Sequence, residues 1–209
     1  MKGNRRTQGE RSEATRTALI NAARPLFTTS GFAGVGTEAI VRAAGVTRGA
    51  LYHQFRDKTD LFAAVAEAVE ADMTARIDTV VSGSGDSDPI ALMKLGAATW
   101  LDACAEPEVH RILLIEAPAV LGWERWRDIG LRYGLGLVQS LVEYAISVGR
   151  IAAQPAEPLA HVLIGALDEA ALYLARADDP ARARSEVGAV MERLIQSLAH
   201  GADAGTGDA

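Results

Sequence analysis

Residues 37–58 read TEAIVRAAGVTRGALYHQFRDK, and this stretch decides the fold. The pattern predicts a short helix that Thr37 caps with its hydroxyl, a turn at Gly45 and a second short helix over residues 48–55. Glycine adopts left-handed backbone angles without a steric penalty, so Gly45 permits a sharp turn. Two helices joined in this way are typical of a helix-turn-helix, whose second helix enters the major groove of DNA.

Apolar residues in this stretch are spaced to hold it against a preceding helix. We expect Ile40, Val46, Leu51 and Phe55 to make that contact. The residues between them would then be free to face DNA, and they are Thr47, Arg48, Gly49, Tyr52 and His53.

The charge of the chain is divided unevenly along its length. The net charge is −6, but residues 1–60 carry a net charge of +5 and the remainder carries −11. Such an asymmetry indicates that one end of a protein meets a polyanion and the other does not. The charges therefore agree with DNA binding by the N-terminal part alone.

The overall composition excludes several classes of protein. With 209 residues, 49% hydrophobic and 23% charged, the chain is long enough for a real core and is unlike a disordered protein. A single cysteine excludes a disulfide framework within one chain and a zinc site of several cysteines. The sequence has no apolar run of the ~18 residues that a membrane span needs, and its polar N-terminus does not resemble a secretory signal. We expect a cytoplasmic protein without membrane contact.

Helical periodicity with sparse proline and glycine predicts an all-α chain. We expect a basic flexible tail over residues 1–12, a three-helix helix-turn-helix domain over 13–60, a helical domain over 61–200 and a second flexible tail over 201–209. The first helix should cover residues 13–29 and bend at Pro25. Further helices are expected from residue 57 to a flexible loop at 82–88, and then over 89–105, 107–115, 123–149, 157–177 and 181–199.

The region from Arg16 to Val65 resembles the DNA-binding domain of the TetR family of bacterial transcriptional regulators. The residues that carry this resemblance are Ala22-Ala23, Leu26-Phe27, Gly31-Phe32, Thr37, Ile40, Ala44-Gly45-Val46, Gly49, Leu51-Tyr52, Phe55, Lys58 and Leu61-Phe62. The chain departs from the pattern at Pro25, inside the first helix, and at Gln54, which supplies no charge between His53 and Phe55.

The resemblance implies a role for each matching position. Thr37 would donate to a phosphate, and Thr47, Arg48 and Gly49 would lie where the recognition helix enters the groove. Arg48 is the best candidate to read a guanine edge. Contacts to the DNA backbone are expected from the remaining polar residues, which are Arg42, Tyr52, His53 and Lys58.

Each of these residues also has a purely structural interpretation. Tyr52 could be a core aromatic residue, His53 a buried histidine, Arg42 a solvated surface residue and Lys58 a plain helix-start residue. The N-terminal arginines Arg5, Arg6 and Arg11 could reach the minor groove or be simply mobile charge.

The acidic C-terminal part is expected to bind a small, mostly apolar molecule. Its aromatic residues could line a pocket between helices, or could be ordinary core, and the acids could orient a ligand or lie in solvent. The candidates are Trp100, Cys104, Glu116, Trp123, Trp126, Tyr133 and Asp168. Gly130, Gly134 and Gly136 would permit close helix packing or leave room for that ligand.

The last two predicted helices carry apolar stripes that would form a four-helix interface between two subunits, as the resemblance implies, or would close the monomer core.

The sequence contains no pattern typical of a catalytic set, and we expect no cofactor. We also expect no metal, because His110, Glu106, Glu108 and Cys104 fit no compact ligand spacing. We interpret the chain as a homodimeric transcriptional regulator. The favoured interpretation is a repressor that a ligand releases from an operator in double-stranded DNA. Two alternatives stay open, namely a regulator without a small-molecule effector and a helical ligand-binding dimer that has lost DNA binding.

Overall fold

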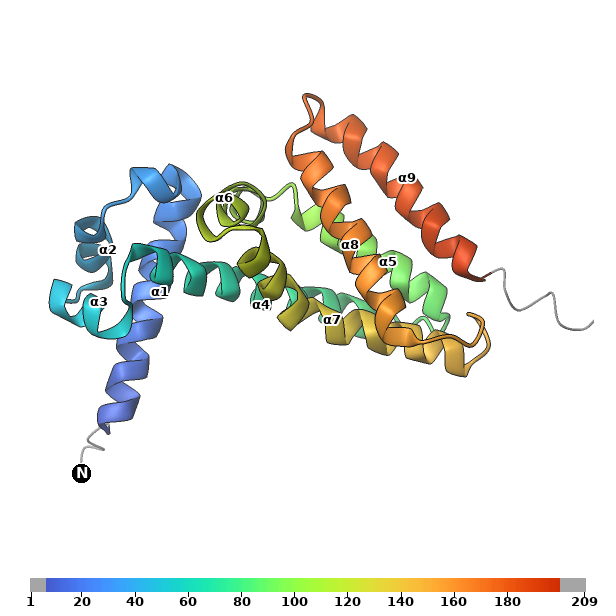
Figure 1. Ribbon diagram of the computed structural model, residues 1–209, viewed down its shortest axis with the longest axis horizontal. Coiled ribbons are helices and arrows are strands. Elements are labelled where there is room, and N and C mark those ends of the chain that lie inside the picture. The colour runs from blue at the N-terminus through green and yellow to red at the C-terminus, as the bar shows by residue number, and fades with distance from the viewer. Residues whose placement is uncertain (1–6, 200–209) are drawn as a thin grey trace, which may run out of the picture.

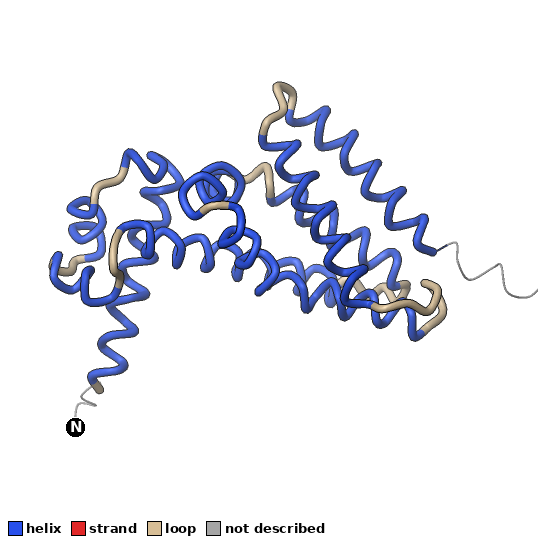
Figure 2. The backbone as a smooth tube through the Cα atoms, viewed as in Figure 1, coloured by secondary structure: helices blue, strands red, loops and turns tan. Residues whose placement is uncertain are grey.

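The computed structural model describes residues 7–199, which form helices joined by short loops, with no strand among them (Figures 1 and 2). The elements in chain order are α1 (Gln8–Gly34), α2 (Thr37–Ala44), α3 (Arg48–Gln54), α4 (Lys58–Gly83), α5 (Pro89–Ala103), a π-helix η1 (Val109–Glu116), α6 (Ala117–Leu121), α7 (Trp123–Ser147), α8 (Ala156–Ala175) and α9 (Pro180–Leu198). Arg5, Arg6 and the expected tail at 201–209 lie outside the described residues.

The prediction of a flexible tail over residues 1–12 is wrong for residues 8–12, which form the first turns of α1. Thr7 and Glu10 make a reciprocal capping box, in which the Thr7 hydroxyl accepts from the Glu10 N–H and the Glu10 carboxylate accepts from the Thr7 N–H. This motif satisfies amide groups that a helix start otherwise leaves unpaired, so the helix begins earlier than its apolar stripe.

Thr37 does not cap α2, which corrects another prediction. The cap is Gly36, with no side-chain hydrogen bond, and Thr37 is already the first helical residue. By contrast, Thr47 caps α3 by accepting from the Ala50 N–H, and Asp57 caps α4 by accepting from the Asp60 N–H.

The break in α1 falls at Gly31 and not at Pro25, whose backbone stays helical. Gly31 has φ +69° and ψ 172°, which is a conformation that is essentially restricted to glycine. The side chains of Arg111 and Glu116 from η1 occupy the space that a Cβ atom would need at this position. Gly31 therefore turns the chain and lets η1 approach the N-terminal helices.

The helices α2 and α3 pack on α1 as their apolar spacing predicts. Ile40, Leu51 and Phe55 are at most 1% exposed and belong to one hydrophobic cluster with Leu19 and Phe27 of α1. Figure 1 shows these three helices together at one end of the molecule, next to the start of α4.

The helix α4 connects the two halves of the molecule. The stretch after its first three residues is buried on every face, since all six residues from Leu61 to Ala66 are at most 6% exposed. Phe62 makes edge-to-face contacts with Phe27 and Phe32, at 5.1 and 5.4 Å between ring centroids. The boundary expected between residues 60 and 61 thus lies inside a continuous helix, and a single hydrophobic cluster extends from Leu19 to Met191.

The remaining helices form a bundle around the C-terminal part of α4. Helices α5, α7, α8 and α9 pack together there, and a second cluster that includes Val142, Leu163 and Ile195 closes the far end. The helix expected over 107–115 is instead the π-helix η1, which continues directly into α6 as far as Leu121. The helix α8 is long and apolar enough by composition alone to cross a membrane, but it packs on α7, α9 and η1, as a core helix does.

Gly31→Ala should destabilise the fold more than Gly45→Ala does. Both glycines have positive φ, but Gly45 lies in the ordinary left-handed region with open space around it. We expect a loss of roughly 1–3 kcal/mol at Gly31 and about 1 kcal/mol at Gly45. Urea unfolding of the two variants measures the difference, and equal losses would contradict the tight approach of η1.

Candidate functional site

The exposed face of α3 carries most of the residues that the sequence predicted to meet DNA. Thr47, Arg48, Gly49 and His53 are exposed, and Tyr52 is 44% exposed, so neither Tyr52 nor His53 is a core residue. The Arg48 guanidinium lies 5.6 Å from the centre of the Tyr52 ring and donates to the Glu38 carboxylate at 3.2 Å. The result is a polar surface with an apolar underside, which is what a recognition helix requires.

Side chains of α1 hold α3 in place from below. The Gln54 amide donates to the Ser12 hydroxyl at 2.8 Å, and Arg16 donates to the Gln54 carbonyl at 3.5 Å. The Arg16 guanidinium also lies 4.5 Å from the centre of the Phe55 ring. Gln54, a departure from the family pattern, thus joins α3 to the first helix.

Three other candidates lie around this face in different environments. Arg42 is exposed at the end of α2, and Thr37 is half-buried, with no hydrogen bond to its hydroxyl from the described residues. Lys58 already has hydrogen-bond partners within the protein, since its ammonium donates to the carbonyls of Phe32 and Val35 at 2.8 and 3.0 Å. Two of its three N–H groups therefore tie α4 to the end of α1, and a phosphate contact by the third stays a prediction.

A mostly apolar cavity lies between α4, α5, α7, α8 and α9. Its volume is about 100 Å³, and it is partly open to solvent. Hydrocarbon side chains such as Met73, Leu137 and Leu163 line it, together with Trp100. Gly130 and Gly134 face open space there, so the absence of side chains at these two positions enlarges the cavity.

Two carboxyl groups stand in this apolar lining. Glu70 of α4 is 8% exposed, and no described residue donates a hydrogen bond to it. Burial, with a smaller contribution from the nearby Asp168 charge, raises the pKa of Glu70 to about 7. Asp168 of α8 pairs with Arg127, yet burial raises its pKa to about 6 against the opposing effect of that guanidinium. The cavity therefore offers acids that can ionise near neutral pH.

Only two of the seven predicted ligand-binding residues, Trp100 and Asp168, line this cavity. The other five do not line this cavity, for reasons of packing, and a contact between any of them and a ligand stays a prediction. Cys104 and Trp126 are buried in the core, and Trp123 is 58% exposed and contacts the Trp126 ring in a tilted arrangement. Glu116 pairs with Arg111 below Gly31, and Tyr133 lies on the outer side between α7 and α4.

Sequence reasoning missed Glu70, although a signal for it exists. Ala66, Glu70, Met73 and Ile77 follow one another at helical spacing on the buried side of α4. A charged residue within such an apolar stripe is costly to bury without a partner, and this marks it as a candidate functional group.

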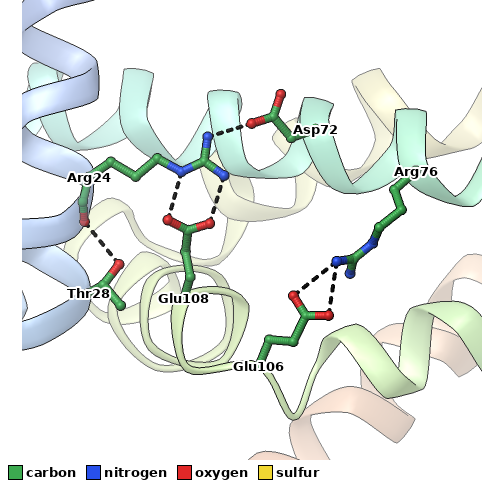
Figure 3. A network of polar contacts seen from close by, with 6 residues as sticks. All are labelled: Arg24, Thr28, Asp72, Arg76, Glu106 and Glu108. Atoms are coloured by element: carbon green, nitrogen blue, oxygen red, sulfur yellow. Dashed lines mark hydrogen bonds and ion pairs between the residues drawn. The ribbon is translucent and has the colours of Figure 1, made fainter.

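An ion-pair network joins the two halves of the molecule (Figure 3). Arg24 of α1 donates through Nε and Nη2 to the two carboxylate oxygens of Glu108, each at 2.7 Å, and also pairs with Asp72 of α4. Arg76, one turn further along α4, pairs with Glu106. The residues Asp72 and Arg76 flank Met73 and Thr74, which line the cavity. One segment of α4 therefore contacts both the cavity and the N-terminal helices.

Comparisons with known proteins agree with this arrangement. A family model described as "Bacterial regulatory proteins, tetR family" matches residues 19–65, and one described as "Tetracyclin repressor-like, C-terminal domain" matches residues 90–198. The crystal structure of a TetR-family transcriptional regulator from Pectobacterium atrosepticum superposes with a TM-score of 0.81, at 31% identity over 93% of this chain and 98% of that one.

Two further proteins align with nearly the whole chain. The transposon Tn10 TetC protein of Escherichia coli is 26% identical and aligns with 93% of this chain and 98% of its own length. The crystal structure of RolR in complex with the ligand resorcinol shares the fold, with a TM-score of 0.72 and 20% identity over 93% of this chain and 97% of that one.

Ionisation of Glu70 should make the free energy of unfolding fall as the pH rises from about 4.5 to about 7. The folded protein binds the Glu70 proton more tightly than the unfolded chain, so this contribution is present at low pH and is lost as pH rises through the folded pKa. We expect a loss of about 2–3 kcal/mol from Glu70 in urea unfolding, with Asp168 adding its own share below pH 6.

The matched variants are Glu70→Gln, which should remove the Glu70 share of the loss, and Glu67→Gln as a control. Glu67 stands three residues earlier on α4 and pairs with Arg132 at the surface. Identical pH profiles for Glu70→Gln and the unaltered protein would contradict the assignment of a buried, unpaired acid.

Proposed function

The chain belongs to the TetR family of bacterial transcriptional regulators, and from this premise we propose that it is a homodimeric repressor, released from a pseudo-palindromic operator by a small, mostly apolar ligand. It is a DNA-binding regulator with a helix-turn-helix domain. The protein would act in the cytoplasm, where operator DNA is accessible. It would bind DNA and a ligand without catalysing a reaction.

The observation that carries the proposal is the surface of α3, where polar residues are exposed above a buried apolar face. Arg48 and Tyr52 stand next to each other on that surface, with Thr47 and His53 on either side. The basic N-terminal part would attract the phosphate backbone, and Arg48 would read a base edge in the major groove. Thr37, Arg42, Gly49 and Lys58 complete the proposed interface as backbone contacts.

Dimer formation through α8 and α9 is supported by apolar side chains that the single chain leaves exposed. Val162 is 67% exposed, Tyr173 53%, Val190 52% and Leu194 39%. The two helices pack side by side along one side of the molecule (Figure 1). Burying these side chains against a second copy is favourable, and two-fold symmetry would present two recognition helices to two half-sites of one operator.

The helix α4 supplies a route from ligand to DNA. Its first residue follows the short loop after α3, its middle lines the cavity, and Asp72 pairs with Arg24 of α1. A ligand that favours a different position of α4 would change the separation of the two recognition helices. The ligand shifts this equilibrium only by its difference in affinity for the two states, so ligand and operator must weaken each other reciprocally.

The two alternatives receive less support. A regulator without an effector would favour a filled core, whereas this chain has a cavity with the fold in which RolR holds resorcinol. A dimer that has lost DNA binding would not need Arg48, Tyr52 and His53 on an exposed basic surface.

Selection of bound fragments from sheared genomic DNA at two salt concentrations should enrich one two-fold symmetric site. On that site, Arg48→Ala should weaken binding by about 1–3 kcal/mol, and Arg48→Ala combined with Tyr52→Ala should abolish specific binding. Fluorescence anisotropy measures both, and Arg132→Ala, at an exposed position of α7, serves as the control. Unchanged operator affinity in the folded double variant would refute the proposed surface.

Val162→Asp combined with Val190→Asp should convert the dimer to a monomer without unfolding it. Both side chains are more than half exposed in the single chain, so aspartate is tolerated there and is excluded only by a desolvated interface. Analytical ultracentrifugation is expected to report half the mass, and operator affinity should fall steeply. A variant that stays dimeric would place the interface elsewhere.

A further inference from the structure

The Glu70 carboxyl is a polar group without a partner in an otherwise well-satisfied interior. It is more than nine-tenths buried, lines the cavity, and receives no hydrogen bond from any described residue. Among residues 7–199, the fully buried side-chain nitrogen or oxygen atom that lacks a hydrogen bond is Arg111 Nε, below Gly31 and away from the cavity, so the unpaired Glu70 oxygens keep some contact with solvent through the cavity. Burying such a group without compensation costs stability, and a ligand that supplies a donor would remove that cost.

The charged groups of the cavity lining are both acidic, namely the carboxyls of Glu70 and Asp168. The hydroxyl of Thr74, which can donate or accept a hydrogen bond, is the neutral polar group beside them. The Trp100 N–H donates to the Leu167 carbonyl at 3.4 Å. None of the residues that line the cavity is lysine, arginine or histidine.

The charged groups on the helices around Glu70 do not neutralise the acidic character of the cavity. On α8, Asp168 already holds the Arg127 guanidinium of α7, which therefore compensates Asp168 and not Glu70. Cys104, at the end of α5, has a thiol whose pKa is raised by burial, so it stays neutral. An anionic ligand would meet two acids here, whereas a cationic ligand would find an unpaired one.

We propose that the effector is an apolar amine whose ammonium group pairs with the Glu70 carboxylate while its hydrocarbon part fills the space beside Gly130 and Gly134. This inference rests on the proposed effector function and names the chemical class of the ligand. Glu70 then acts as the selectivity residue of the cavity, because it favours cations over neutral or anionic molecules of the same shape.

Three molecules of similar shape but different charge test whether the cavity prefers a cation. They are 4-phenylbutylamine, 4-phenylbutanol and 4-phenylbutyrate. Isothermal titration calorimetry on the full chain should show the amine binding roughly tenfold or more tightly than the alcohol, and the acid binding most weakly. Affinity for the amine should rise between pH 6 and pH 8, as Glu70 ionises while the amine stays charged. The amine should also lower operator affinity in the same buffer.

Two variants separate the role of Glu70 from general effects on the fold. Glu70→Gln has the same shape, and we expect it to lose the preference for the amine and the pH dependence while retaining the affinity for the alcohol. Glu67→Gln removes a charge from the same helix near the surface and should leave all three affinities unchanged. Thermal unfolding of each variant verifies that it is folded.

The outcomes distinguish this inference from the proposed function. If the alcohol or the acid binds as tightly as the amine, the cavity still accepts small molecules but the charge rule is overturned. If Glu70→Gln keeps the amine preference, Glu70 is not the selectivity residue. If none of the probes binds, the cavity does not admit ligands of this size, and the effector part of the proposed function fails with the inference while DNA binding is unaffected.

Discussion

The complete burial of α4 just after its first turn is the constraint on which the rest of the structure depends. Six consecutive residues, from Leu61 to Ala66, face protein in every direction. A helix that is apolar all round must be enclosed, so α1, η1 and α7 have to surround it. The Phe27, Phe32 and Phe62 rings lock this junction, and Lys58 adds two hydrogen bonds to the end of α1. The two halves of the chain cannot move apart without exposing this core.

In the mechanism that we propose, α4 stays packed in the core, so a ligand would act on the N-terminal helices by shifting this helix as a whole. Its cavity side carries Glu70 and Met73, and Asp72 and Arg76 beside them hold Arg24 and Glu106. A ligand in the cavity would therefore act next to the residues of α4 that pair with α1. The unpaired acid and the glycines of α7 lower the stability of this region, and we interpret that cost as the consequence of leaving room for a ligand.

The sequence predicted the DNA-facing half well, since its determinants are local. The turn at Gly45, the cap at Thr47 and the spacing of Ile40, Leu51 and Phe55 lie within one short stretch, and they alone decide which face of α3 is exposed. Errors in this half concern helix starts and the position of the break in α1. The early start of α1 depends on a two-residue capping box, and the break at Gly31 depends on Arg111 and Glu116, which are far away in the sequence.

The cavity could not be predicted in the same way. Its lining comes from five helices spread over residues 70–195, and aromatic content led to Trp123 and Trp126, whose rings contact each other outside the cavity. By itself the sequence determined that the chain is helical, which residues of α3 face outward and which family the N-terminal half resembles, because these follow from neighbours a few positions apart. Only the tertiary structure decided that Glu70 would stand unpaired in an apolar cavity. Whether a hydrogen-bond donor or a cation lies next to it depends on how helices distant in the sequence pack.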